Sequence, residues 1–360
     1  MPSFTAMIQD YSPLISYDSH WFSGSSNDNR LDRYSDNSMM VTNVTGASAT
    51  FRFNGTSVNV YGAKRSNHGS YQVTLDGRTS PAETGFNDTG IYQTLLFSSI
   101  TLEQSFHELI VTNEGADDRP FLDIDFITWQ ISIGSVDESL VVNTVQDTDP
   151  SFIYSPPSAW SSSPEHSEFY FGSTGHSSVE SGSVLTYSFS GEGVSLYGPV
   201  GPGYAAFSVQ LDDSPSVNST AIRKSFVPQV LLYHADGLGS GQHVLKMMMQ
   251  PSDDDQELAV DFANVYTTSS LRSSTSTKSL SMPTGTVVGI AISVSVTFAL
   301  LCIALYLFLR NRRTASSHAT TKDPPFLPSR SNVEPFMSFH SDNADRYHIY
   351  TSEKLPVPNI

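Results

Sequence analysis

The sequence contains a single cysteine, Cys302, among its 360 residues. One cysteine excludes a disulfide framework, and it also excludes a cysteine-based zinc site elsewhere in the chain. Basic residues are scarce as well, because 19 Lys and Arg face 36 Asp and Glu and leave a net charge of −17. A chain this acidic repels the phosphates of nucleic acids, so we expect no nucleic-acid partner.

Before residue 285 the sequence lacks both helical periodicity and the short motifs of common enzymes. There is no Gly-x-Ser-x-Gly elbow, no His-Glu-x-x-His pair and no phosphate-binding loop. Gly191-Glu192-Gly193 lacks the third glycine of a dinucleotide site. We therefore predict that the chain is not an enzyme and needs no cofactor. Paired carboxylates for glycoside hydrolysis stay open, because they need only be close in space.

One long apolar segment is present near the C-terminus. Residues 286–309 carry no charge and consist mostly of Val, Ile, Ala, Leu and Phe. As a helix they would span roughly 36 Å, more than the hydrocarbon core of a bilayer, so we predict a single transmembrane helix. The basic run Arg310–Arg313 follows at once. The positive-inside rule then places residues 310–360 in the cytoplasm and residues 1–285 outside, at the plasma membrane.

Polar segments of low complexity lie on both sides of this predicted span. Residues 269–285 are rich in Ser and Thr and are typical of an extended stalk. We predict that residues 310–360 form a disordered tail, in which Pro325–Arg330 matches a ligand of SH3 domains. Residues 1–14 lack the basic and apolar regions of a signal peptide. Either a first segment is missing, or the span itself directs export.

The region before the span contains an internal repeat with an offset of 136 residues. The matched pairs include Val58 and Val194, Tyr61 and Tyr197, Val73 and Val209, Gln93 and Gln229, His107 and His243, and Asp125 and Asp261. Trp21 and Trp160 are 139 residues apart, so a short insertion or deletion separates them from the other pairs. We predict two copies of one domain, at residues 11–133 and 148–268.

Apolar and polar residues alternate within each copy. Phe51-Arg52-Phe53 and Leu122-Asp123-Ile124-Asp125-Phe126 have a period of two, which is typical of strands with one buried face. Asn54-Gly55 and Asp76-Gly77 are dipeptides of tight turns. Antiparallel strands with one buried face need a second sheet to cover it, so the sequence predicts an all-β chain of two β-sandwiches.

Four segments of the first copy carry a resemblance to a known fold family. They are residues 53–62, 69–77, 95–107 and 122–126, which resemble the galactose-binding-like domains of carbohydrate-binding modules. The resemblance implies two tandem jelly-roll β-sandwiches. The tandem copies with a stalk, one span and a short tail also resemble surface proteins of mushroom-forming fungi, and this implies binding to a glycan or a cell-wall polymer.

Sugar-binding sandwiches present aromatic rings and hydrogen-bonding side chains on their end loops. The loop after Gly62 offers Arg65, Asn67 and His68 as ligand contacts in the first copy, and Tyr204 can stack on a sugar in the second. The alternative is an ordinary solvated loop. The two loops share almost no chemistry, so we do not expect the copies to bind one ligand in the same way.

Two repeated pairs of residues allow both a structural and a functional interpretation. Trp21 and Trp160 are predicted to close one end of each core, with stacking platforms for sugars as the alternative. Asp125 and Asp261 are predicted to be exposed carboxylates on the last strand, with a structural calcium site as the alternative.

His107 and His243 fall on the core face of their strands, and we predict that both are buried and hydrogen-bonded. Four glycosylation sequons precede the span, at Asn43, Asn54, Asn87 and Asn218. Together these features predict a non-catalytic single-pass membrane protein whose two extracellular modules recognise a glycan or the cell wall. The alternatives are a structural or adhesive spacer without a sugar site, and a glycan-processing enzyme or its accessory subunit.

Overall fold

A computed structural model of the chain describes residues 1–24, 28–116, 118–135, 137–253 and 255–269. Within these residues the chain is all-β, as predicted, and its helices are short 3-10 turns. The predicted stalk beyond Ser269, the predicted span at 286–309 and the tail with Pro325–Arg330 lie outside the described residues. In the part of the chain that the structure describes, no helix has the length and apolar character needed to cross a membrane.

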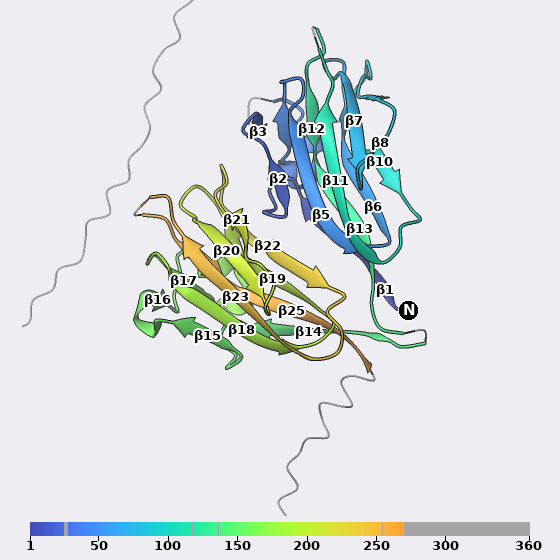
Figure 1. Cartoon of the computed structure of the whole chain (residues 1–360). Coiled ribbons are helices and arrows are strands. Elements are labelled where there is room, and N and C mark those ends of the chain that lie inside the picture. The colour runs from blue at the N-terminus through green and yellow to red at the C-terminus, as the bar shows by residue number, and fades with distance from the viewer. Residues whose placement is uncertain (25–27, 117, 136, 254, 270–360) are drawn as a thin grey trace, which may run out of the picture. The chain divides into compact units, whose positions relative to one another are not determined.

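Two main sheets and one small sheet form the first sandwich (Figure 1). The main sheets have the orders β1-β13-β6-β10 and β2-β5-β11-β7-β8, with β9 paired to β7, and the small sheet has the order β12-β4-β3. The strands are β1 (Ser3–Gln9), β2 (Ile15–Tyr17), β3 (Trp21–Ser23), β4 (Met40–Thr42), β5 (Ser48–Gly55), β6 (Ser57–Lys64), β7 (Ser70–Leu75), β8 (Arg78–Thr79), β9 (Glu83–Thr84), β10 (Ile91–Ser99), β11 (Ser105–Asn113), β12 (Leu122–Ile124) and β13 (Phe126–Ser132).

The second sandwich repeats this topology, except that the single strand β21 stands in place of the two short strands β8 and β9. Its sheets have the orders β14-β25-β19-β22, β15-β18-β23-β20-β21 and β16-β17-β24. The strands are β14 (Leu140–Gln146), β15 (Phe152–Ser155), β16 (Trp160–Ser161), β17 (His176–Ser178), β18 (Val184–Ser190), β19 (Gly193–Val200), β20 (Ala206–Leu211), β21 (Val217–Thr220), β22 (Val227–Asp236), β23 (Gln242–Gln250), β24 (Leu258–Val260) and β25 (Phe262–Thr268). The repeat in the sequence is therefore a repeat of a whole sandwich.

The first sandwich begins earlier than the repeat in the sequence indicates. β1 precedes residue 11, and it pairs along its full length with β13, with Ile8 opposite Ile127. This pairing completes one edge of a main sheet. In the second sandwich β14 takes the same place beside β25.

The alternating apolar residues form the two cores. Trp21 and Trp160 are 7% and 9% exposed and belong to these cores. Trp21 packs on Tyr17 with ring centroids 5.2 Å apart, and Trp160 packs on Tyr154 at 4.9 Å. Both tryptophans are core residues, and their burial argues against the alternative of sugar-stacking platforms.

Two of the buried histidines, His107 and His243, occupy matching positions in the two sandwiches. His107 Nδ1 lies 2.7 Å from Asp76 Oδ2, and His243 Nδ1 lies 2.8 Å from Asp212 Oδ2. The prediction that both histidines are buried and hydrogen-bonded is confirmed. Each pair joins a main-sheet strand to the turn after its neighbour, and so helps to set the register of that sheet.

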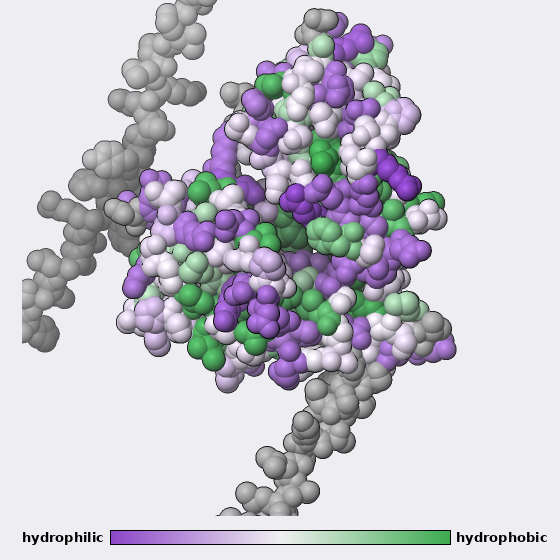
Figure 2. Space-filling view, viewed as in Figure 1, coloured by the Kyte–Doolittle hydropathy of each residue, from purple (hydrophilic) through white to green (hydrophobic). Residues whose placement is uncertain are grey.

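Apolar side chains on the outer surface are dispersed. On the face displayed in Figure 2 they form small separate patches among polar residues. Such scatter is normal for folded proteins and by itself indicates no binding surface. The loops at the ends of the sandwiches are therefore the first place to look for a site.

Candidate functional site

Four loops that are distant in sequence meet at one end of the first sandwich. The turn after β6 forms isolated bridges from Arg65 to Phe86 and from His68 to Phe121. Gly69 closes this turn, and its N–H donates to the carbonyl of Phe121 (3.0 Å). A Cβ at this position would lie 2.2 Å from the carbonyl oxygen of Arg119, so the close approach of the loops requires glycine.

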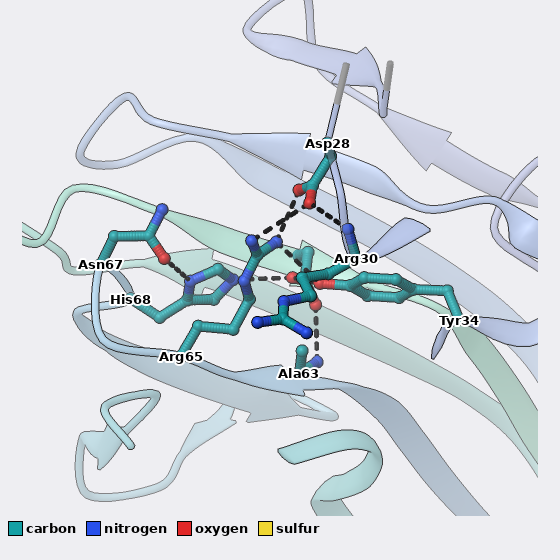
Figure 3. Close-up of polar contacts among 8 residues, drawn as sticks. Asp28, Arg30, Tyr34, Ala63, Arg65, Asn67 and His68 are labelled. Atoms are coloured by element: carbon teal, nitrogen blue, oxygen red, sulfur yellow. Dashed lines mark hydrogen bonds and ion pairs between the residues drawn. The ribbon is translucent and has the colours of Figure 1, made fainter. Parts of the chain in front are cut away.

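A buried carboxylate holds these loops together (Figure 3). Asp123 is fully buried and accepts three hydrogen bonds, from the hydroxyl of Tyr34 (2.5 Å), from Nε2 of His68 (2.7 Å) and from the N–H of Ala63 (2.6 Å). A buried charge is tolerated only when it is paired and hydrogen-bonded, and this one has a donor from each neighbouring segment. Burial and the Asp123 charge both raise the pKa of Tyr34, which keeps its phenol protonated and donating.

Arg65 connects this buried centre to the surface. Its guanidinium makes a two-armed contact with Asp28 (2.7 and 3.3 Å) and also lies 3.4 Å from the hydroxyl of Tyr34. Burial opposes ionisation of Asp28, but hydrogen bonds from Arg65 and from the N–H of Arg30 hold its pKa below the usual value. Asn67 is half-buried on the same turn and lies 3.0 Å from Nδ1 of His68. Arg65 and Asn67 thus form a partly exposed rim around the buried centre. This rim offers fixed hydrogen-bond donors to a polar ligand.

Cationic side chains cover the aromatic rings at this end. The guanidiniums of Arg33 and Arg65 lie 5.3 and 5.7 Å from the ring centroid of Tyr92. Arg119 lies 3.9 Å from the ring centroid of Phe86. With these ring faces occupied, hydrogen bonding rather than stacking is the main interaction available to a ligand here.

The carboxylate of Asp125 supports the loop that carries Tyr34. Both of its oxygens accept the N–H of Ser35 (3.0 and 3.3 Å), and Asp261 accepts the N–H of Phe171 in the same way (3.0 Å to each oxygen). Both aspartates are fully buried, so our prediction of exposed strand carboxylates is wrong. β12 ends at Ile124 and β13 begins at Phe126, and every residue from Leu122 to Asp125 is buried, so the alternation expected from the sequence does not hold here.

Burial raises the pKa of both Asp125 and Asp261 to about 7, and neighbouring carboxylates add to the effect. A calcium ion requires six to eight oxygen ligands. Within the described residues no group of three or more His, Cys, Asp or Glu side chains is placed to hold a metal ion. The partner that the structure gives each aspartate is a backbone N–H, that of Ser35 for Asp125 and that of Phe171 for Asp261.

The structure divides the predicted ligand contacts into buried and accessible ones. His68 is 1% exposed and Tyr204 is 5% exposed, so neither lies where we predicted a ligand contact. Arg65 and Asn67 are partly exposed on the rim. Ligand contact by these two residues stays a prediction.

The second sandwich lacks the buried ionic centre. At the positions of His68 and Asp123 it has Tyr204 and Ala259, while Tyr170 matches Tyr34. The hydroxyls of Tyr170 and Tyr204 lie 3.4 Å apart in place of the network. The two buried partners are replaced together, which is expected because a single replacement would leave the other unpaired.

Sequence reasoning missed a row of polar side chains on the second sandwich. Ser195 Oγ lies 2.8 Å from Nδ1 of His234, whose Nε2 lies 3.0 Å from Asp236. Serine hydrolases use the same three residue types. However, Ser195 is 1% exposed and its hydroxyl also contacts Tyr266 (3.2 Å), so a substrate has no path to it in this structure. Only the pairing of β19 with β22 brings these residues together, and no short motif signals it.

The four sequon asparagines differ in accessibility. Asn43 and Asn218 are exposed, and Asn54 and Asn87 are half-buried. Oδ1 of Asn54 accepts a hydrogen bond from Nε2 of Gln104 (3.1 Å). A glycan attached to the amide nitrogen of Asn54 would crowd this contact. Glycosylation of the four sites stays a prediction.

A comparison with known proteins found no matching family model. A curated relative is an A type blood alpha-D-galactosamine galactosaminidase from Flavonifractor plautii, 25% identical over 230 residues. The similarity covers 63% of this chain and 20% of the relative, so the chain spans about one fifth of that protein.

Two solved structures also resemble part of the chain. One is the CBM36-1 domain of a xylanase from the hindgut metagenome of Trinervitermes trinervoides, with 9% identity, a TM-score of 0.27, and coverage of 37% of this chain and all of that one. The other is a two-domain esterase active on acetylated mannans, with 14% identity, a TM-score of 0.29, and coverage of 36% and 38%. TM-scores this low do not bear on function.

The comparisons correct one prediction made from the absence of motifs. We predicted that the chain is not an enzyme, and its similarity to a galactosaminidase contradicts this. Missing short motifs were a poor guide, because glycan-processing enzymes use carboxylates that are brought together only by folding.

Proposed function

We propose that the chain takes part in glycan processing and that the end loops of its first sandwich hold the glycan. The observation that carries the proposal is the similarity to a galactosaminidase. It extends over 230 residues, and the strands of the first sandwich span only residues 3–132. A match of that length extends beyond the first sandwich.

The rim around Arg65 supports the proposal. Asp28 and Tyr34 fix the guanidinium, so little conformational entropy is lost when a sugar hydroxyl accepts from it. The half-buried amide of Asn67 adds a donor and an acceptor on the same turn. Arg33 and Arg119 are exposed beside it.

A glycan array and a turnover assay with the full-length chain test this proposal. We expect the chain to bind at least one glycan on the array and to hydrolyse a chromogenic α-galactosaminide in the turnover assay. Arg65→Lys keeps the charge but loses the two-armed geometry, and we expect it to weaken glycan binding by about 10-fold or more. Arg52→Lys is the matched control, because Arg52 pairs with Glu108 on an exposed sheet face.

The outcomes separate recognition from processing. Absence of binding to every glycan, or equal losses in the Arg65 and Arg52 variants, would overturn the assigned site. Binding without turnover of any retained glycan would contradict the processing role.

We also propose that residues 286–309 anchor the chain in the plasma membrane, with residues 1–285 outside. The uncharged segment and the basic run after it support this topology. Protease treatment of intact cells should remove the sandwiches and spare the tail, and a glycosidase should shift the mobility of the chain. A tail that is cut in intact cells would contradict the topology.

A further inference from the structure

One glycosylation sequon of the first sandwich adjoins the rim formed by Arg65 and Asn67. The N–H of Asn87 donates to the carbonyl of Arg65 (3.2 Å), and the N–H of Arg65 donates to the carbonyl of Gly85 (2.9 Å). Arg65 and Phe86 form a parallel bridge. Chain segments paired in this way lie roughly 5 Å apart. Asn87 therefore lies about one strand spacing from the turn that carries the rim.

The sequon at Asn87 folds as a compact turn. Oδ1 of Asn87 accepts the N–H of Thr89 (3.1 Å) and its hydroxyl (3.0 Å), which is the geometry of an Asx turn. Asp88 and Thr89 are exposed, and Asn87 is half-buried. Both bonds use Oδ1, and neither uses Nδ2, the nitrogen to which a glycan is attached. A glycan on Asn87 is therefore compatible with the folded turn.

Two other sequons differ from this one in their surroundings. Nδ2 of Asn54 donates to the carbonyl of Asp236 (3.3 Å), so a glycan there would displace a hydrogen bond of the folded chain. Asn218 is exposed but lies in β21, on the second sandwich. The turn at Asn87, in contrast, is bonded directly to the turn of Arg65.

The second sandwich keeps this loop but not the sequon. The N–H of Arg223 donates to the carbonyl of Gly201 (3.0 Å), as that of Asn87 does to the carbonyl of Arg65. Gly201 and Ile222 form the matching parallel bridge. Arg223 stands at the position of Asn87, so this loop of the second sandwich has no attachment site. The same backbone bonds hold the loop in both copies, and the sequon is present in the copy that has the Arg65 rim.

A glycan attached at Asn87 competes with a free glycan for the rim. The side chain of Arg65 is only 17% exposed, and Asp28 and Tyr34 hold its guanidinium in place (Figure 3). The guanidinium therefore cannot turn aside to meet a ligand elsewhere. A glycan tethered one strand spacing away is branched and bulky, and its sugars have an effective concentration of about millimolar at the rim. It excludes free glycans that bind more weakly than that.

We propose that glycosylation of Asn87 closes the Arg65 rim to free glycans. The transfer forms a bond between Nδ2 of Asn87 and C1 of the first sugar. It breaks the bond between C1 and the diphosphate of a lipid-linked oligosaccharide, and the displaced amide proton goes to the departing lipid diphosphate. The inference rests on the proposed function and on the proposed position of residues 1–285 outside the membrane.

Binding of the full-length chain from a eukaryotic host to the glycan array tests the proposal, and peptide mass spectrometry measures the occupancy of each sequon. We expect a glycan on Asn87, and we expect Asn87→Gln to bind array glycans at least about 10-fold more tightly than the parent. Thr89→Val removes the sequon but keeps Asn87, and it should have the same effect. Adding Arg65→Lys to Asn87→Gln should remove the gain. Asn218→Gln is the matched control, because it removes an exposed sequon on the second sandwich.

A second measurement separates the attached glycan from the side chain that carries it. The parent and Asn87→Gln are produced while an inhibitor blocks formation of the lipid-linked sugar, and the two sugar-free chains should bind equally. A difference that persists in these chains would overturn the inference. An Asn87 without a glycan, or equal binding by the glycosylated parent and Asn87→Gln, would overturn it and leave the rim as the binding site. Absence of binding to every glycan by the sugar-free chains would overturn the proposed function as well.

Discussion

The buried pair of His68 and Asp123 has a natural replacement within the same chain. The second sandwich carries Tyr204 and Ala259 at the matching positions, and the hydroxyl of Tyr204 meets that of Tyr170. Because Tyr34 already stands at the position of Tyr170, the double variant His68→Tyr, Asp123→Ala should rebuild the tyrosine pair in the first sandwich. We predict that the two substitutions together cost less stability than the sum of their single effects.

The magnitudes follow from the contacts. Asp123→Ala leaves the hydroxyl of Tyr34, Nε2 of His68 and the N–H of Ala63 without their acceptor in a site without solvent access. Loss of one partner of such a buried pair costs about 3–5 kcal/mol. His68→Tyr removes one donor to a buried carboxylate and costs about 1–3 kcal/mol. In the double variant the two tyrosine hydroxyls pair and only the N–H of Ala63 stays without an acceptor, so we expect a loss of about 1–3 kcal/mol, well below the sum of the single losses.

Urea denaturation followed by tryptophan fluorescence measures this coupling. Trp21 and Trp129 report on the first sandwich, and a Trp160→Phe background removes the signal of the second. The free energy of unfolding is compared for the parent, the two single variants and the double variant. The reasoning would be refuted if the loss in the double variant equalled the sum of the two single losses to within about 0.5 kcal/mol, because independent sites behave in that way.

Two further predictions concern the aspartates and the turn. The pKa of Asp261 is raised from 3.8 to about 7 in the folded chain, so its stabilising contribution is complete below pH 3.8 and is lost as the pH rises through about 7. Relative to Asp261→Asn, the parent should lose stability over that window, by roughly 4 kcal/mol at most, in pH-dependent denaturation; parallel curves would contradict the assignment. Gly69→Ala should lower the unfolding free energy by about 1–3 kcal/mol. Gly203→Ala is the control and should leave stability unchanged, since a Cβ there meets nothing within 4 Å. Thermal denaturation compares the two variants, and equal shifts of their melting temperatures would refute the steric argument.

Repetition made much of the fold predictable. An offset of 136 residues predicts that any contact in one copy has a counterpart in the other, and the His107–Asp76 and His243–Asp212 pairs agree with it. Alternation of apolar residues indicated the strands, because one face of each strand packs in a core. These signals arise from burial, which a single sequence records well.

The site was predictable only in part. Asp125 was assigned to the outward face from the alternation of residues 122–126, but every residue from Leu122 to Asp125 is buried and Asp125 lies between β12 and β13. His68 was predicted to contact a ligand because it lies on a polar end loop, whereas it is buried against Asp123, which lies 55 residues away in sequence. A pairing of that kind depends on how the loops fold over one another, and no local pattern records it.

The two copies agree in their scaffold and differ at one end. Both keep the buried aspartate that accepts a backbone N–H and the glutamine that donates to the carbonyl of the end turn, at Arg33 or Phe169. The side chain on that turn changes from arginine to phenylalanine, and the half-buried residue opposite changes from Phe121 to Glu257. The restraints on the turn are therefore shared by both copies, while the side chains that the turn presents differ. This division is expected where a common scaffold carries loops of different chemistry.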